Sequence, residues 1–288
     1  MTVLYLILIV QSVILTSLEA HQESLEPPKS VTAVRIQQEP PAIDGVLDDD
    51  IWAEAPIYSG FLQRDPKQGE LATEKTSFQI AYDDEAVYFG VVCFDSEPDK
   101  ISARLGRRDS RLDSDRVSIN LDPYHDHQTG YWFSVYASGV QYDGSLAGRR
   151  GSDETWDGIW EARTTVHDQG WNAEFKIPYH VLRFTQKDQY VWGINILRDI
   201  SRKNERDLWV LITREQSGWV SYFGHLESIK NISPPRHLEV TPYLMGRSIH
   251  QNRTNLFTSI GGNVRYGITS GTSIIAVSYT HLRAHETR

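Results

Sequence analysis

Aromatic side chains are the residues of this chain best suited to recognition chemistry. The 288-residue sequence contains 8 Trp and 14 Tyr but only 2 Met. The flat faces of Trp and Tyr can cover the apolar side of a sugar, while planar polar groups bond its hydroxyls. Trp156 and Trp160 lie in an acidic, glycine-containing segment, where sugar binding and packing are both open interpretations. For Trp52, Trp171 and Trp192 we expect packing, because large rings on strands or a short helix are usually buried.

Acidic residues suggest a second kind of site, for a metal ion. Carboxylates are hard oxygen ligands, which suit Ca²⁺ better than Zn²⁺. Asp115 and Asp122 are the predicted calcium ligands, among other candidates at Asp48–Asp50, Asp113 and Asp126. The spacing of an EF-hand loop does not occur, and acidic turn residues also act as simple caps.

Sequence motifs of catalysis are missing from the chain. Among 38 acidic residues, none of Asp157, Glu161 and Glu174 can be singled out as an acid–base pair. Neither a Gly-x-Ser-x-Gly nucleophile motif nor a phosphate or dinucleotide loop is present. His125 and His127 have no third ligand at zinc spacing, which predicts a solvated loop. Whether the chain is part of an enzyme therefore stays open; if it is, a glycoside hydrolase is the expected class.

Charge and cysteine content exclude several classes of partner. The formal net charge of -9 argues against nucleic acid and against an anionic membrane surface. With one cysteine the chain cannot form an internal disulfide. Cys93 lies in an apolar run, which predicts a buried and unreactive thiol.

The elements that must position these residues are mostly short strands. Apolar and polar residues alternate in several runs, as in Arg116–Leu121, and this period of two is typical of half-buried antiparallel strands. Strands are predicted at 31–36, 76–82, 87–94, 116–121, 131–136, 159–166, 171–177, 190–197, 208–212 and 219–226. Only Asp48–Ala55, with Asp48 as its N-cap, and Tyr179–Phe184 suggest short helices. The pattern predicts an all-β fold, an antiparallel β-sandwich with one or two short helices.

Both ends of the chain differ from this middle part in composition and in their pattern of apolar and polar residues. Residues 2–16 are almost all apolar, which predicts a signal peptide over 1–20 (or a membrane anchor), followed by a linker over 21–30. Pro234-Pro235 marks a boundary after the sandwich at 31–229. Residues 236–276 alternate weakly with Gly and Tyr, which is typical of the first strands of a truncated outer-membrane β-barrel. Residues 277–288 resemble a translated sequencing adapter.

The segment from Ile43 to Ala55 reads Ile-Asp-Gly-x-Leu-Asp-x-x-x-Trp-x-x-Ala and resembles the opening of carbohydrate-binding module family 9. Further similar stretches are 80–91, 115–122, 129–131, 170–178 and 192–195. The resemblance covers roughly residues 33 to 229, and the segment 156–161 together with the later strands is most similar to a subgroup fused to outer-membrane barrels. The family often holds structural calcium.

Family members clamp a terminal sugar between two aromatic rings, and this implies a role for Trp219. It matches the position of one clamp residue, whereas Leu112 or its neighbours stand where the other is expected, just before Asp115. Tyr131 and Trp132 could substitute for the second ring, because they lie next to an expected loop. Together with Trp156 and Trp160, these residues make up the predicted carbohydrate site.

The resemblance implies an exported carbohydrate-binding module that recognises a poly- or oligosaccharide. Such a module would belong to the periplasm or outer membrane of a Gram-negative-type bacterium, in a protein linked to carbohydrate catabolism. The missing second ring favours an alternative, an interaction or gating domain of an outer-membrane barrel without sugar affinity. A further alternative is the accessory part of a glycoside hydrolase.

Overall fold

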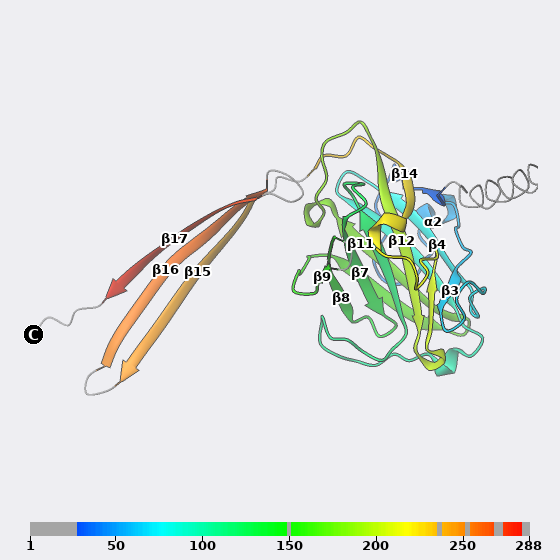
Figure 1. Ribbon diagram of the computed structural model, residues 1–288, viewed down its shortest axis with the longest axis horizontal. Helices are drawn as coiled ribbons and strands as arrows, with labels where there is room; N and C mark the ends of the chain where they lie inside the picture. The colour runs from blue at the N-terminus through cyan, green and yellow to red at the C-terminus, as the bar shows by residue number, and fades with distance from the viewer. Residues whose placement is uncertain (1–27, 149–150, 235–237, 251–253, 268–272, 284–288) are drawn as a thin grey trace, which may run out of the picture.

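A computed structural model describes residues 28–148, 151–234, 238–250, 254–267 and 273–283. Two sheets form a sandwich (Figure 1). The larger has nine strands, with the path β1 (Ser30–Thr32), β14 (Gly224–Lys230), β12 (Gln189–Ile200), β6 (Arg116–Asp122), β7 (Thr129–Tyr136), β8 (Gln141–Ala147) and β9 (Gly151–Asp153). Beside this path, β13 (Glu205–Leu208) pairs with β12 and with β3 (Leu62–Asp65).

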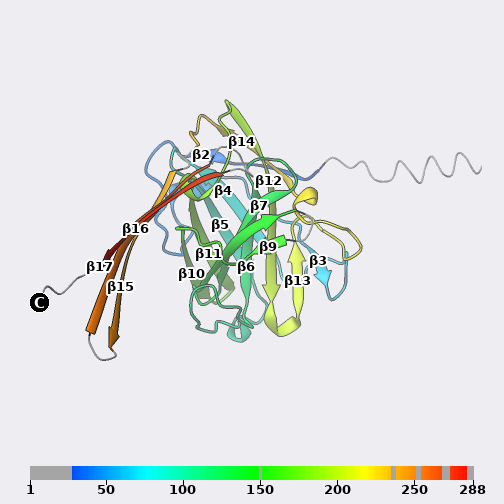
Figure 2. The ribbon, with the colours of Figure 1, turned by 60° about the vertical axis from the view of Figure 1, so that its left-hand side comes forward.

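The second sheet of the sandwich has five strands. Their order is β10 (Glu161–His167), β11 (Gly170–Pro178), β5 (Ala86–Phe94), β4 (Thr76–Tyr82) and β2 (Val34–Arg35). Figure 2 shows this sheet as a separate layer beside the nine-stranded sheet. One core cluster fills the space between them and takes alternate residues from both, including Val117, Ile119 and Leu121 of β6 and Phe89 of β5. The predicted all-β sandwich with few helices is confirmed.

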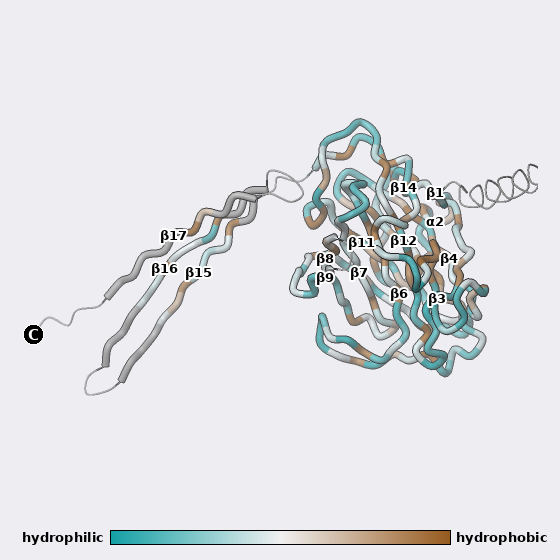
Figure 3. The backbone as a smooth tube through the Cα atoms, viewed as in Figure 1, coloured by the Kyte–Doolittle hydropathy of each residue, from teal (hydrophilic) through white to brown (hydrophobic). Residues whose placement is uncertain are grey.

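The core also contains the single cysteine. Cys93 of β5 is fully buried, and burial raises the pKa of its thiol to about 11. A thiol with such a pKa stays protonated at neutral pH and is a poor nucleophile. Hydrophobic positions are found mainly along the strands of the sandwich, whereas many of the connecting loops are hydrophilic (Figure 3).

Some element boundaries differ from the predicted ones. The helix α2 (Asp50–Glu54) has Asp49 as its N-cap, without a side-chain capping bond, instead of Asp48. The predicted strand 208–212 ends at its first residue, because β13 stops at Leu208. The predicted strand 219–226 begins only at Gly224, after the 3₁₀ turn η4 (Val220–Tyr222). The remaining 3₁₀ turns are η1 (Pro98–Lys100), η2 (Tyr179–Val181) and η3 (Ser201–Lys203).

A buried carboxylate fastens the Asp-Gly turn and α2 to the five-stranded sheet. Glu174 of β11 accepts hydrogen bonds from the backbone N–H groups of Asp44 and Gly45, at 3.0 and 2.8 Å, and from the indole N–H of Trp52 at 2.9 Å. Gly45 has φ +88°, and a Cβ there would meet Thr165 Oγ1 at 2.8 Å, so only glycine fits. Trp52 is 4% exposed. The opening segment therefore covers the outer face of this sheet.

The strands after Pro234 form a separate antiparallel sheet. It contains β15 (Leu238–His250), β16 (Thr254–Gly267) and β17 (Ser273–Arg283), and its described strands pair only with one another. They are not closed into a barrel. β17 takes in residues 277–283 of the adapter-like segment. The predicted signal peptide and residues 21–27 lie outside the described residues. Within the described ranges, helices long and apolar enough to span a bilayer are absent.

Candidate functional site: a groove on the outer face of the large sheet

The outward-facing residues of β6 and β7 form the floor of a cavity of about 500 Å³. Arg116, Ser118 and Asn120 point outward because they alternate with the buried core residues of β6. We call this cavity the outer groove; Arg116, Ser118, Asn120, Trp132, Asp199 and Trp219 are among its lining residues. Its size is that of an ordinary small-molecule site.

Trp219 forms one wall of the outer groove. It immediately precedes η4, and its side chain is partly buried. Its indole N–H points at Asn120 Oδ1 at 3.5 Å, the guanidinium of Arg64 lies 5.1 Å from its ring centroid, and Phe223 meets it edge-on. These contacts fix the orientation of the ring, and a cation over an aromatic face is itself stabilising.

Trp132 lies low in the floor of the same groove. It is 9% exposed, and its ring meets Tyr142 edge-on at 4.5 Å between centroids. Gly144 on the neighbouring strand β8 makes room for it, because a Cβ there would lie 2.6 Å from the Trp132 ring. Leu112 also lines the groove, and its N–H donates to Tyr136 Oη at 3.1 Å. The fold thus brings Trp219, Trp132 and Leu112 together.

The other three predicted aromatic residues lie on the core side of the large sheet. Tyr131 packs against Trp156, with 5.0 Å between ring centroids, and burial raises the pKa of Tyr131 to about 12. Trp160 is 4% exposed, stacks on Phe175 at 5.9 Å and donates its indole N–H to Asp143. Tyr131 faces the core because it is adjacent to Trp132 along β7, and adjacent strand residues point to opposite faces. Trp156 and Trp160 lie between β9 and β10, and both pack edge-on against Phe133 of β7.

A charged cluster supplies hydrogen-bonding groups to the outer groove. Asp199 of β12 accepts bonds from Arg116 Nε at 3.1 Å and from Arg206 Nε at 2.7 Å. Burial pushes the pKa of Asp199 up, but the charges and hydrogen bonds of the two arginines outweigh it and hold the pKa below its usual value. The carboxylate therefore stays ionised, and the remaining N–H groups of the guanidinium pair could bond sugar hydroxyls.

The cluster of Arg116, Asp199 and Arg206 was not among the predicted site residues. The alternation in β6 showed that Arg116 faces outward, but Asp199 and Arg206 come from distant strands. They reach the groove through the pairings of β12 with β6 and with β13. A single sequence carries no signal for such a pairing.

The predicted calcium ligands do not form a shared site. Asp115 precedes β6 and Asp122 ends it, which places them about 23 Å apart at the usual rise per strand residue. Asp115 accepts the N–H of Ser201 at 3.0 Å, and Asp122 accepts the N–H of His127 at 2.9 Å. Burial raises the pKa of both carboxyls, that of Asp122 to about 6. In the described part of the chain, groups of three or more His, Cys, Asp or Glu arranged for a metal are absent.

The predicted solvated His pair lies in the turn between β6 and β7 and has a third histidine beside it, from β14. The rings of His125 and His127 lie 4.5 Å apart between centroids, and His225 of β14 lies 5.0 Å from His125. Burial and the two neighbouring imidazoles lower the pKa of His125. Uncharged imidazole is thereby favoured at neutral pH.

Another cavity, of about 590 Å³, lies between residues 36–42 and α2. Its lining consists of aliphatic, acidic and amide side chains, and aromatic rings are missing from it. The outer groove is therefore the better candidate for a site that stacks on sugar rings.

Comparison with known proteins gives the same fold. The model of a family described as "Carbohydrate family 9 binding domain-like" matches residues 43–225. A candidate carbohydrate-binding protein from Bacteroides uniformis has a similar structure, with 12% identity and a TM-score of 0.56, covering 69% of this chain and 99% of its own. A family 9 module from Caldicellulosiruptor kristjanssonii, solved with glucose and with cellotriose, has 17% identity and a TM-score of 0.49 over 72% of this chain and 100% of its own. Among curated proteins none matches.

Proposed function

The chain belongs to the carbohydrate family 9 binding domain-like family, and on this basis we propose that its outer groove binds a poly- or oligosaccharide. The observation that carries the proposal is the position of Trp219 in one groove with Trp132 and with the Arg116–Asp199–Arg206 cluster. An aromatic face beside fixed polar groups is the combination that sugar recognition needs.

Within the groove the residues take different roles. Trp219 provides the main stacking face, because its partly buried ring forms a wall, whereas Trp132 lies nearly buried in the floor. Asn120 and the charged cluster bond hydroxyl groups. Tyr131, Trp156 and Trp160 support the groove from the core side and do not touch the ligand.

A binding experiment tests this proposal directly. The protein and its Trp219→Ala variant are applied to a glycan array, and affinities for the glycans that bind are measured by titration calorimetry. We expect an affinity loss of about 5- to 150-fold in the variant, since stacked rings contribute on the order of 1–3 kcal/mol in comparable aromatic recognition. Ile159→Ala, which removes a side chain that is 79% exposed and outside the groove, is the matched control. Equal binding by both variants contradicts the role of Trp219.

The cellular setting is a further part of the proposal. We place the protein in the envelope of a Gram-negative-type bacterium, exported by residues 1–20 and linked to carbohydrate catabolism. The register of β15 and β16 supports a membrane-facing surface after Pro234, because Val240 pairs with Val264 and Leu244 with Ile260, and all four are exposed. An apolar face on alternating residues is typical of outer-membrane strands. Fractionation of cells that express the natural full-length protein tests this placement.

A second candidate function is an interaction or gating domain without sugar affinity. Leu112 favours it, because an aliphatic residue stands where a second stacking ring is expected. Failure to bind any glycan on the array would support this candidate over the first. An accessory role in a glycoside hydrolase remains a prediction that depends on sequence beyond these residues.

A further inference from the structure

We propose that the outer groove holds an interior stretch of a linear polysaccharide instead of gripping a chain end, an inference that rests on the proposed function. Two more cavities continue the outer groove, one of about 310 Å³ and one of about 490 Å³. The first shares Leu112, Ser114, Asp199 and Arg206 with the groove, and the second shares Trp219. The three cavities thus lie next to one another along the outer face of the large sheet, and we infer that a ligand can occupy them together as one channel.

The channel is longer than a single sugar ring. The cavity beyond Leu112 lies where β6 begins, and the cavity beyond Trp219 includes His127 of the turn after β6. The seven residues of β6 alone span about 20 Å at the usual rise per strand residue. A chain of several sugars is needed to fill this length.

Exposed loop residues border both ends of the channel. Asp113 and Asn204 lie at one end, and Gln128 and Gly148 lie at the other, and all four are exposed to solvent. A site for a chain end needs a wall that stops the next sugar. Here solvent-exposed positions stand at both exits, so a glycan chain could continue in either direction.

Leu112 stands at the junction of the outer groove and the first additional cavity. An indole at this position would project into the junction and divide the channel. The leucine side chain is smaller and packs against the Trp132, Tyr136 and Tyr142 cluster, so it fills less of the junction. The absence of a second ring, which argues against terminal-sugar binding, is thus consistent with binding along a chain.

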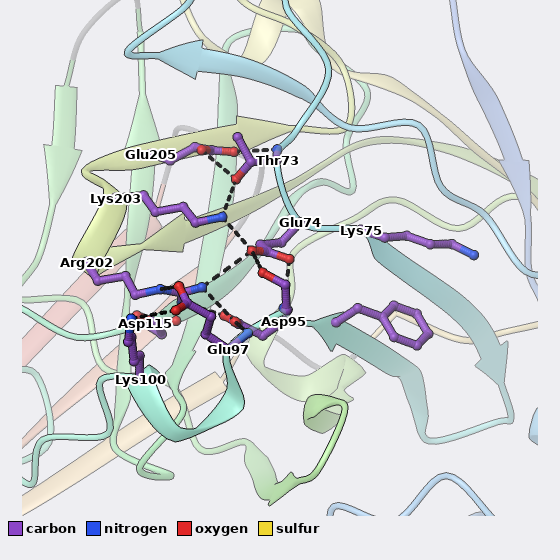
Figure 4. A network of polar contacts seen from close by, with 12 residues as sticks. Thr73, Glu74, Lys75, Asp95, Glu97, Lys100, Asp115, Arg202, Lys203 and Glu205 are labelled. Carbon is purple, nitrogen blue, oxygen red and sulfur yellow. Dashed lines mark hydrogen bonds and ion pairs between the residues drawn. The ribbon is translucent and has the colours of Figure 1, made fainter.

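The end of the channel near η3 is held rigidly. Arg202 of η3 donates to both carboxylate oxygens of Asp95, at 2.6 and 2.7 Å, and Glu205 of β13 accepts bonds from the N–H and hydroxyl of Thr73, at 2.7 and 2.8 Å (Figure 4). This network ties the turn between β12 and β13 to the loops beside β4 and β5. A preformed wall lowers the entropic cost of ordering the site around a ligand.

Dependence of affinity on chain length tests the inference. Gluco-, xylo- and manno-oligosaccharides with β-1,4 linkages, from disaccharide to hexasaccharide, are titrated into the protein. For the series that binds, we expect the association constant to rise at least tenfold from disaccharide to hexasaccharide. Borohydride reduction of the terminal sugar should change the hexasaccharide affinity less than twofold.

Two variants sharpen the test. Leu112→Trp, which narrows the junction, should reduce the ratio of hexasaccharide to disaccharide affinity about tenfold. Ile159→Ala should leave that ratio unchanged. Affinity that is already maximal for the disaccharide, or is lost on reduction of the terminal sugar, overturns the inference but leaves the proposed function standing. Lack of binding by every oligosaccharide, together with an empty glycan array, overturns both.

Discussion

The outer faces of the two sheets each carry a tryptophan and a carboxylate, but the two pairs have opposite consequences. On the five-stranded sheet, Trp52 of α2 donates its indole N–H to Glu174 and is buried between the helix and the sheet, at 4% exposure. On the nine-stranded sheet, Trp219 and Asp199 line an accessible groove. Burial of an indole with a bonded N–H stabilises the fold, whereas a partly exposed indole contributes less to folding and remains available to a ligand.

The largest expected effect is a loss of folding stability at Trp52, on the outer face of the five-stranded sheet. Trp52→Ala should lower the free energy of unfolding by about 3–5 kcal/mol, because it removes a large buried ring and leaves a cavity. Urea denaturation followed by tryptophan fluorescence measures the loss. Trp219→Ala should cost about 1 kcal/mol or less, as a change at a partly exposed position. Similar losses from the two substitutions would break the distinction between the faces.

Glu174→Gln should cost about 2 kcal/mol, because the amide places an N–H₂ group against one of three buried N–H donors. The same denaturation experiment applies. Glycan affinity of the folded variant should match that of the wild type, since Glu174 lies on the opposite sheet from the groove. A large change in affinity would mean that the two outer faces are coupled.

Gly144→Ala changes a residue beside the Trp132 ring in the floor of the outer groove, so it should affect both packing and ligand binding. The new Cβ would lie 2.6 Å from the Trp132 ring and 2.8 Å from the backbone oxygen of Asp153, so both the ring and the neighbouring strand β9 must move. We expect a loss of stability of about 1–2 kcal/mol and a measurable loss of glycan affinity. An affinity equal to that of the wild type would show that the exact height of Trp132 in the floor is unimportant for binding.

The smallest expected effect is on the pH dependence of stability, which should have opposite signs for Glu174 and Asp199, the carboxyl groups of the two outer faces. The pKa of Glu174 is raised by burial, so its contribution to stability is full below its unfolded pKa of about 4.3 and falls as pH rises toward its folded pKa. The pKa of Asp199 is lowered, so its contribution is full above its unfolded pKa of about 3.9 and falls as pH drops toward its folded pKa.

Melting temperatures measured from pH 3 to 8 follow these two contributions. Glu174→Gln should reduce the loss of stability that occurs as pH rises above about 4.3. Asp199→Asn should reduce the loss that occurs as pH falls below about 3.9. Parallel pH profiles for both variants and the wild type would contradict the assignment.

Alternation along the chain was sufficient to predict much of the fold. The strand at Thr76–Tyr82 begins and ends where its pattern predicted. The strand β8 was missed because Asp143 and Gly144 are poor strand formers. Its glycine is explained by the Trp132 ring on one neighbouring strand and the backbone oxygen of Asp153 on the other, contacts that depend on tertiary structure.

The candidate site was predictable only in part. Trp219 was predicted from the family resemblance, and Trp132 from its position next to an expected loop. Whether Trp156 and Trp160 are buried depends on how β7 and β11 pack, which the sequence does not show. Asp199 and Arg206 entered the groove through strand pairings that a single sequence does not reveal. Local pattern determines the direction in which a residue points, but tertiary packing determines whether it meets a core or a cavity.

The bond set around Glu174 has a consequence for evolution. Its carboxylate accepts the backbone N–H groups of Asp44 and Gly45 and the indole N–H of Trp52 at once. Replacing Glu174 therefore leaves three buried donors unmet, and replacing Trp52 removes the partner of one carboxylate oxygen. Selection for stability alone is then enough to keep the set together. A lineage could lose or exchange its ligand at the groove while this signature persists, and homologues recognised by the signature can be expected to share an architecture more widely than a ligand.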